Sequence, residues 1–183
     1  MNGANRGGKV SYSLEEFCIN VRELLANENV TAREKVRSEL ERLLADPAFC
    51  RRYVGPDSEP GVVQIFEDGD TGFCVLAYNM EADRRSPPHD HGSSWAVYGQ
   101  AVGYTDMTIW EASERDIKPV REFRLEPGQA GLFDVREIHS IRYPAGSKFV
   151  RVTGVDMAGE MRRVYDPQTG ACREVGDMGA GRA

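Results

Sequence analysis

Histidine is scarce in this sequence, with only three among 183 residues: His89, His91 and His139. Long hydrophobic runs are also missing, because the longest, 73–78, is far too short to span a bilayer, so no membrane association is expected. Basic runs are absent too, and 23 basic against 29 acidic residues give a net charge of -6. Such a chain is not expected to bind nucleic acid.

Paired cysteines are a further absence. The four cysteines, Cys18, Cys50, Cys74 and Cys172, are widely spaced and form no C-x-x-C motif. We therefore expect buried small side chains rather than a disulfide framework. The polar first residues contain no signal-peptide core, so the sequence favours a cytoplasmic protein.

The length favours one domain with short appendages at both ends. Ser13 to Glu16 has the pattern of a capping box, Thr31 to Glu34 repeats it, and apolar residues follow each at helical spacing. We predict helices over about 13–27 and 31–45, in a helical lobe over 13–50. Residues 1–12 and 176–183 are rich in glycine and polar residues and are predicted to be flexible. The oligomeric state is expected to be a monomer or a homodimer.

From residue 61 the pattern changes to short β-rich runs separated by turn residues. Many short strands without alternating helices predict an antiparallel sandwich or barrel over 61–175, so the single domain covers 13–175. The predicted strands are 62–67, 72–80, 94–103, 104–111, 120–125, 131–135, 139–143, 148–155, 161–165 and 171–175.

The segment Pro87-Pro88-His89-Asp90-His91-Gly92 holds two of the three histidines. In an extended chain, side chains two positions apart share a face, so His89 and His91 point one way and Asp90 the other. His139 on a neighbouring strand would complete a three-nitrogen site. Neutral nitrogen ligands suit iron, nickel, copper and zinc better than calcium or magnesium.

A β-rich barrel with H-x-H and a lone histidine some fifty residues later resembles the cupin superfamily. The usual glutamate after the second histidine is replaced here by Trp95 and Ala96. Three histidines without the glutamate resemble the cysteine dioxygenase-like thiol dioxygenases. The P-x-H-D-H-G-x-S pattern, the two helices before the barrel and the closing segment 165–170 are similar to that branch.

The resemblance implies a cupin-type double-stranded β-helix barrel, or jelly roll, with two N-terminal helices. It also implies a mononuclear non-haem Fe(II) enzyme that oxidises a small, anionic thiol to its sulfinate with O2. His89, His91 and His139 would be the metal ligands; zinc, nickel and manganese are the alternative metals. The residues leave two other functions open: a cupin metalloenzyme acting on a non-thiol small molecule, and a non-catalytic cupin that binds metal or a small molecule.

Several positions depart from that branch. Its carboxylate-binding arginine aligns with Val63, which cannot bind a carboxylate. Ala96 stands where animal members have the cysteine that cross-links to a tyrosine. The Ser-x-His-x-Tyr set aligns with 151–155, which keeps neither the histidine nor the tyrosine. L-Cysteine is therefore not the expected substrate.

Two residues are predicted to orient the substrate. Strand alternation puts Arg151 on the face that points inward in the family, where a guanidinium needs an anion; a structural ion pair is the alternative. Tyr98 could offer its hydroxyl to a bound ligand, and packing in the core is its alternative. Packing is favoured for Trp95 and Tyr143, and a turn rather than metal ligation is expected at Glu137.

Overall fold

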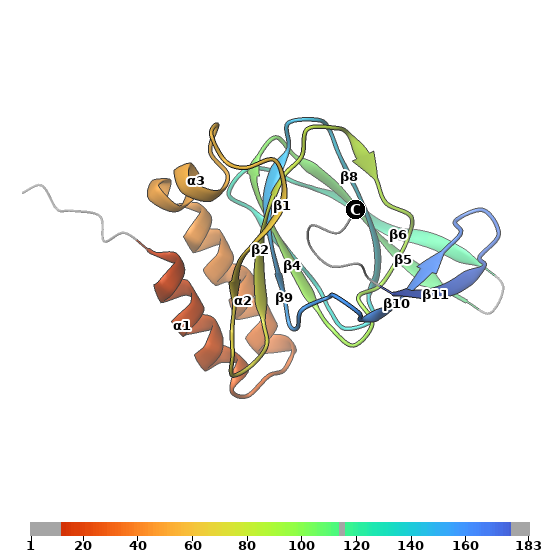
Figure 1. The fold of residues 1–183 in the computed structure, drawn as a ribbon. Helices are drawn as coiled ribbons and strands as arrows, with labels where there is room; N and C mark the ends of the chain where they lie inside the picture. Colours follow the sequence, from red (N-terminus) through yellow and green to blue (C-terminus); the bar gives the residue numbers. More distant parts are fainter. Residues whose placement is uncertain (1–11, 114–115, 177–183) are drawn as a thin grey trace, which may run out of the picture.

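The computed structural model describes residues 12–113 and 116–176 (Figure 1). Its helices precede its strands, in the order predicted. The described helices are α1 (Leu14–Leu25), α2 (Val30–Leu44) and α3 (Pro47–Tyr53). The described strands are β1 (Gly61–Glu67), β2 (Cys74–Asn79), β3 (Arg84–Arg85), β4 (Ala96–Val102), β5 (Thr105–Ala112), β6 (Ile117–Leu125), β7 (Ala130–Phe133), β8 (Ile138–Tyr143), β9 (Lys148–Thr153), β10 (Met161–Tyr165) and β11 (Cys172–Gly176).

The helix ends follow local capping. Ser13 accepts a hydrogen bond from the Glu16 amide at 3.1 Å, and the Glu16 carboxylate accepts one from the Ser13 amide at 2.8 Å, so the predicted capping box of α1 is confirmed. The second predicted box is wrong. Helix α2 is capped by Asn29, whose side chain accepts from the Ala32 amide at 3.0 Å, and it begins before Thr31.

Helix α3 was not predicted. It has only seven residues, with Asp46 as its cap and proline in its first turn, a pair that also occurs in simple turns. The predicted flexible ends lie almost wholly outside the described residues. Tyr12, at the boundary, is buried, and its amide donates to the Asp46 carboxylate at 2.9 Å.

The strands form two antiparallel sheets and a hairpin. Within the described residues, the five-stranded sheet has the order β1-β2-β9-β4-β7 and the four-stranded sheet the order β3-β8-β5-β6, while β10 pairs with β11. Figure 1 shows the helices lying along one side of the five-stranded sheet, with the four-stranded sheet on its other side. The barrel therefore has one wall covered by helices.

Both faces of the five-stranded sheet are buried. On β4, Val97 packs with the helices, whereas Ala96 and Tyr98 belong to the cluster inside the barrel. On β9, Val150 points to the helices and Phe149 into the barrel. This alternation fixes which side chains of the sheet line the barrel interior.

Burial of the cysteines agrees with the prediction in part. Cys18 and Cys74 are buried, and burial raises the pKa of each thiol to about 12. Cys50 is half-buried and Cys172 is exposed. No disulfide links the cysteines, all of which lie within the described residues.

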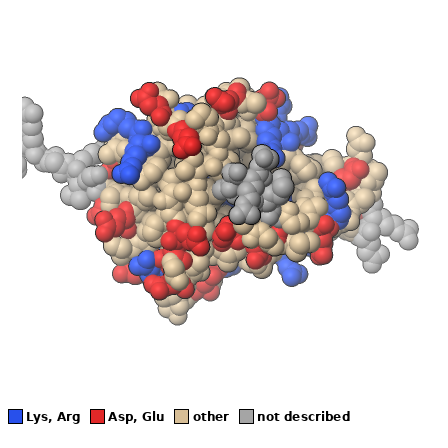
Figure 2. Space-filling view, in the orientation of Figure 1, with Lys and Arg blue, Asp and Glu red and all other residues tan. Residues whose placement is uncertain are grey.

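The charged side chains on the visible face are mixed in sign (Figure 2). On the face shown in Figure 2, acidic and basic side chains are interspersed, and no continuous basic band crosses the described residues. Among the helices that the structure describes, none has the length and apolar character needed to cross a membrane.

Candidate metal centre

The H-x-H segment is extended chain between two strands. The His89 amide donates to the His139 carbonyl at 2.9 Å, and the His139 amide donates to the His89 carbonyl at 2.9 Å. On its other side His89 forms a β-bridge with Val164 of β10. The segment therefore lies between β8 and β10, and the bridge places the side chains of His89 and His139 next to each other.

The three histidines converge inside the barrel. Their ring centroids are 5.5 Å apart for His89 and His91, 4.6 Å for His89 and His139, and 4.9 Å for His91 and His139. One nitrogen from each ring lies within 4.8 Å of the other two. The residues are 5%, 1% and 0% exposed, respectively. The predicted H-x-H face, completed by His139, is thus present as one cluster.

Backbone carbonyls orient two of the rings. Nδ1 of His89 lies 2.8 Å from the Pro87 carbonyl, and Nδ1 of His139 lies 3.3 Å from the Glu137 carbonyl. A carbonyl accepts only, so each Nδ1 carries the proton and donates it. This tautomer places the lone pair of each ring on Nε2, the atom through which such an imidazole binds a metal.

The cluster also contains buried nitrogen atoms without partners. Nε2 of His139 and Nδ1 of His91 make no hydrogen bond to any described residue. Nε2 of His91 lies 3.3 Å from the Tyr98 hydroxyl. A buried polar atom without a partner is costly, and an ion bound by the three rings would remove that cost for His139. The residues therefore fit a divalent metal.

The imidazoles of His91 and His139 are held in the neutral form. Burial lowers the pKa of His91 well below its usual value, and the nearby rings of His139 and His89 lower it further. Burial likewise lowers the pKa of His139, followed by the effect of His89. Because only a neutral imidazole can ligate a metal, the environment keeps the cluster ready to bind one near neutral pH.

Arg151 lies on the inner face of the barrel, as predicted. It pairs with Tyr98 across β9 and β4, and its guanidinium carbon lies 5.3 Å from the centroid of the Tyr78 ring. Its positive charge contributes to the lowered pKa of His91 and of His139. Arg151 therefore adds positive charge to the environment of the histidines from the inner face of the barrel.

A second arginine, Arg162 on β10, lies on the face toward the same cluster and was not among the predicted site residues. It lies two residues before Val164, which bridges His89, so it shares the face on which the His89 ring lies. Its charge also contributes to the lowered pKa of both buried histidines. The cluster thus has guanidinium groups from two separate strands beside it.

Asp90 points away from the cluster, as predicted, and fastens the H-x-H segment to β10. Its carboxylate accepts from the Arg163 side chain at 2.7 Å, from the Arg163 amide at 2.9 Å and from the Gly92 amide at 3.1 Å. The Asp90 side chain is fully buried. These bonds fix the segment that carries two of the three ligands.

The remaining candidates have structural roles. Trp95 packs in the core between the sheet and the helices, away from the barrel interior. Tyr143 packs inside the barrel against Phe149, with ring centroids 5.4 Å apart. The Glu137 carboxylate accepts from the Asp134 amide at 2.8 Å, so the expected turn is present. Val63 pairs with Ala77, a residue of the helix-side core.

No protein-family model matches the chain, and no curated protein matches its sequence. Solved structures that are similar to this chain include the Cnp3 cupin domain of Schizosaccharomyces pombe. It has 12% sequence identity and a TM-score of 0.42, over 52% of this chain and 64% of that chain. KdgF from Halomonas sp. has 16% identity and a TM-score of 0.40 over 53% of this chain and 82% of that chain. The aligned part therefore spans less than two thirds of the Cnp3 domain.

Likeness at this level carries no information about activity. The fold is shown by the chain itself: two facing antiparallel sheets, a helical lobe before them, and inward-pointing histidines on adjacent segments. It is the mainly β, cupin-type barrel that the sequence predicted.

Proposed function

We propose that this chain is a mononuclear non-haem Fe(II) dioxygenase that oxidises a small anionic thiol to its sulfinate. The observation that carries the proposal is a buried cluster of three imidazoles, two of them held neutral by burial, with two guanidinium groups on strands beside it. The reaction adds both atoms of O2 to sulfur, so that a thiolate R–S⁻ and O2 give R–SO2⁻ without another reductant.

His89, His91 and His139 would hold the metal through ring nitrogens. Bound Fe(II) would supply the chemistry that brings O2 and the substrate sulfur together. The protein contributes neutral ligands, which leave the metal's charge to be offset by an anionic substrate. The barrel residues around the rings exclude bulk water, because the histidines are almost fully buried.

Arg151 and Arg162 would bind the part of the substrate that does not react. A guanidinium forms paired hydrogen bonds with a carboxylate, and its charge favours an anion in a site with little water. Two cations beside the metal also disfavour a substrate with an ammonium group. We therefore expect 3-mercaptopropionate to be a better substrate than cysteine or cysteamine.

Tyr98 would orient the ligand through its hydroxyl. This hydroxyl lies 3.3 Å from Nε2 of His91. When that nitrogen binds the metal, it no longer accepts a hydrogen bond from Tyr98. The hydroxyl can then donate to the substrate or to oxygen beside His91.

The test combines metal analysis with oxygen uptake, using protein purified without a histidine tag. We expect about one iron per chain, loss of iron in His139→Ala, and uptake that depends on 3-mercaptopropionate. Arg151→Gln and Arg162→Gln should each raise KM for this substrate at least tenfold, since a charge-assisted hydrogen bond contributes about 1.5–3 kcal/mol. Arg173→Gln, an exposed substitution on β11, is the matched control and should leave KM unchanged.

Other results of these assays would refute the proposal and favour a different function or a different metal site. Iron without thiol-dependent uptake would refute the thiol substrate and favour a metalloenzyme acting on another small molecule. Bound metal with no turnover of any substrate in a panel of thiols, diketones and phenolic acids would favour a binding protein. Full metal occupancy in His139→Ala would show that the cluster is not the metal site.

A further inference from the structure

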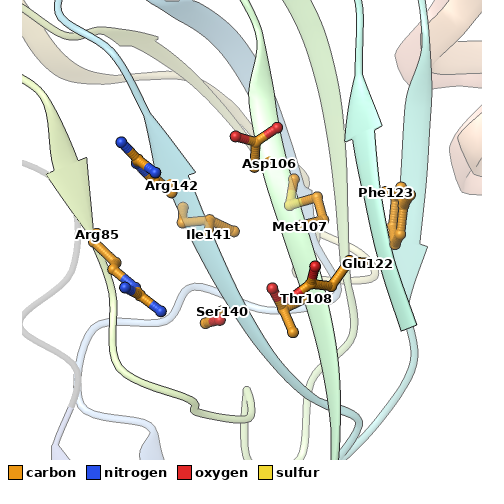
Figure 3. Close-up of a pocket in the computed structure, with 9 residues that line it drawn as sticks. All are labelled: Arg85, Asp106, Met107, Thr108, Glu122, Phe123, Ser140, Ile141 and Arg142. Carbon is orange, nitrogen blue, oxygen red and sulfur yellow. The ribbon is translucent and has the colours of Figure 1, made fainter. Parts of the chain in front are cut away.

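The outer face of the four-stranded sheet carries a hollow of about 440 Å³. It lies on the far side of the sheet from the barrel core, because Met107 and Ile141 point inward while their neighbours Thr108 and Ser140 point outward. Figure 3 shows side chains from β3, β8, β5 and β6 around it, with Arg85 extending toward Ser140. None of the three histidines lines this hollow.

Two arginines occupy directly opposed positions on neighbouring strands beside the hollow, and their side chains point in different directions (Figure 3). Arg85 of β3 is directly opposite Arg142 of β8, and both are exposed. Like charges at directly opposed positions destabilise a sheet. Asp106 is opposite Arg142 on the other side, but its carboxylate oxygens accept from Arg124 at 2.6 and 3.1 Å. Within the described residues, neither Arg85 nor Arg142 forms an ion pair.

The floor of the hollow holds a buried hydroxyl. Ser140 is 6% exposed and accepts a hydrogen bond from the Trp110 indole nitrogen at 2.9 Å. Its own proton has no acceptor among the described residues, so the hydroxyl can donate to a ligand. Thr108, which pairs with Ser140 across β5 and β8, adds a second hydroxyl. The hollow is also lined by Glu122, which pairs with Thr108 across β5 and β6 and lies beside it in Figure 3. The end with Arg85 and Ser140 is therefore the end that suits an oxyanion.

A second hollow, of about 370 Å³, adjoins the first and shares Arg85 and Ser140 with it. Its lining is largely apolar and includes Pro87, Pro88 and Trp110. The two hollows together therefore offer a cationic end and an apolar end, joined at Ser140. That combination suits a molecule with an anionic group on an aromatic or apolar body.

We propose that this outer groove, formed by Arg85, Arg142, Ser140 and Trp110, binds a small aromatic or apolar molecule that carries a carboxylate or phosphate group. The oxyanion would lie against the Arg85 guanidinium and the Ser140 hydroxyl, and its charge would offset the repulsion between Arg85 and Arg142 (Figure 3). The body would lie against Trp110 and the prolines. The groove flanks the backbone that carries the metal ligands, because Ser140 follows His139 and Pro87 accepts the hydrogen bond from His89.

Tryptophan fluorescence provides the test, with phenyl phosphate and benzoate as probes. The chain has two tryptophans, and Trp95 is only 1% exposed, so a change on binding should come from Trp110. We expect saturable quenching by at least one probe, and loss of that signal in Trp110→Phe. Quenching by phenyl phosphate alone would identify a phosphate monoester, and quenching by both probes would identify oxyanions in general.

Variants separate this groove from other sites. Arg85→Gln and Arg142→Gln should each weaken probe binding at least tenfold. Arg84→Gln is the control, since it removes the same charge from the same short strand but on its other face. His139→Ala should bind the probe as the wild type does, which distinguishes the groove from the metal centre. Probe binding in the groove can therefore be judged whether or not the chain oxidises thiols.

The proposal is overturned if quenching does not saturate, if it survives both arginine substitutions, or if Arg84→Gln weakens it equally. Thermal unfolding gives an independent check without any ligand. Arg142→Gln should raise Tm by about 1–4 °C because it removes the repulsion with Arg85. Phenyl phosphate should reduce the difference in Tm between Arg142→Gln and the wild type. An unchanged or lowered Tm would contradict the charge conflict on which the site depends.

Discussion

The glycine after the second histidine provides a sharp test of how the metal segment is held. Gly92 has a φ of +61°, and a Cβ built on it would lie 2.2 Å from the carbonyl oxygen of Met161 on β10. That oxygen belongs to the backbone, so it cannot rotate away. In Gly92→Ala the left-handed conformation costs about 1–2 kcal/mol. The overlap adds about 1–3 kcal/mol, for a total of about 2–5 kcal/mol.

Gly146 supplies the matched control. Its φ is +81°, and a Cβ built on it meets nothing within 4 Å. Gly146→Ala should therefore lose only the conformational part, about 1–2 kcal/mol. The difference in stability loss between Gly92→Ala and Gly146→Ala gives the free-energy cost of the overlap with Met161. Urea unfolding of the metal-free proteins measures both, and each kcal/mol should lower Tm by about 2–4 °C for a chain of this size.

The steric overlap in Gly92→Ala should also disturb the metal centre, because the H-x-H segment or β10 must move to relieve it. We expect weaker iron binding in Gly92→Ala and wild-type iron binding in Gly146→Ala, both measured by titration of the metal-free protein. Equal losses of stability in the two variants would refute the close approach of Gly92 to β10. A large loss of stability with intact iron affinity would show that the contact does not position the histidines.

Two further substitutions test buried carboxylates. Asp90→Asn should reduce the free energy of unfolding by about 2–4 kcal/mol. This is less than for a fully buried ion pair, because the Arg163 side chain is 38% exposed. In urea unfolding, the control Asp106→Asn should have a much smaller effect, because this pair lies on the surface. Arg22 holds the pKa of Asp68 well below its usual range, so the stability from this pair is complete above about pH 4 and is lost as the pH falls below it. Between pH 6 and pH 3, Asp68→Asn should therefore lose less stability than the wild type. If the urea midpoints of the two proteins fell by the same amount over this range, the ion pair between Arg22 and Asp68 would not contribute to stability.

The sequence predicted the histidine cluster because the evidence for it is local. Alternation along an extended chain puts His89 and His91 on one face, and scarcity of histidine left His139 as the third ligand. The inner positions of Arg151 and Tyr98 follow from the same period of two. Helix boundaries were less predictable, because Asn29 and Thr31 are both good capping residues and tertiary packing decides between them.

A strand buried on both faces does not reveal which face lines a cavity unless polar residues interrupt it. On β9, Arg151 and Thr153 alternate with Val150 and Val152, so the polar positions mark the inner face. On β10, two arginines stand side by side and no alternation distinguishes them. Only the bridge between His89 and Val164 sends Arg162 toward the histidines and Arg163 toward Asp90. That register joins segments 75 residues apart, since 164 - 89 = 75, so the second arginine of the site is visible only in the folded chain.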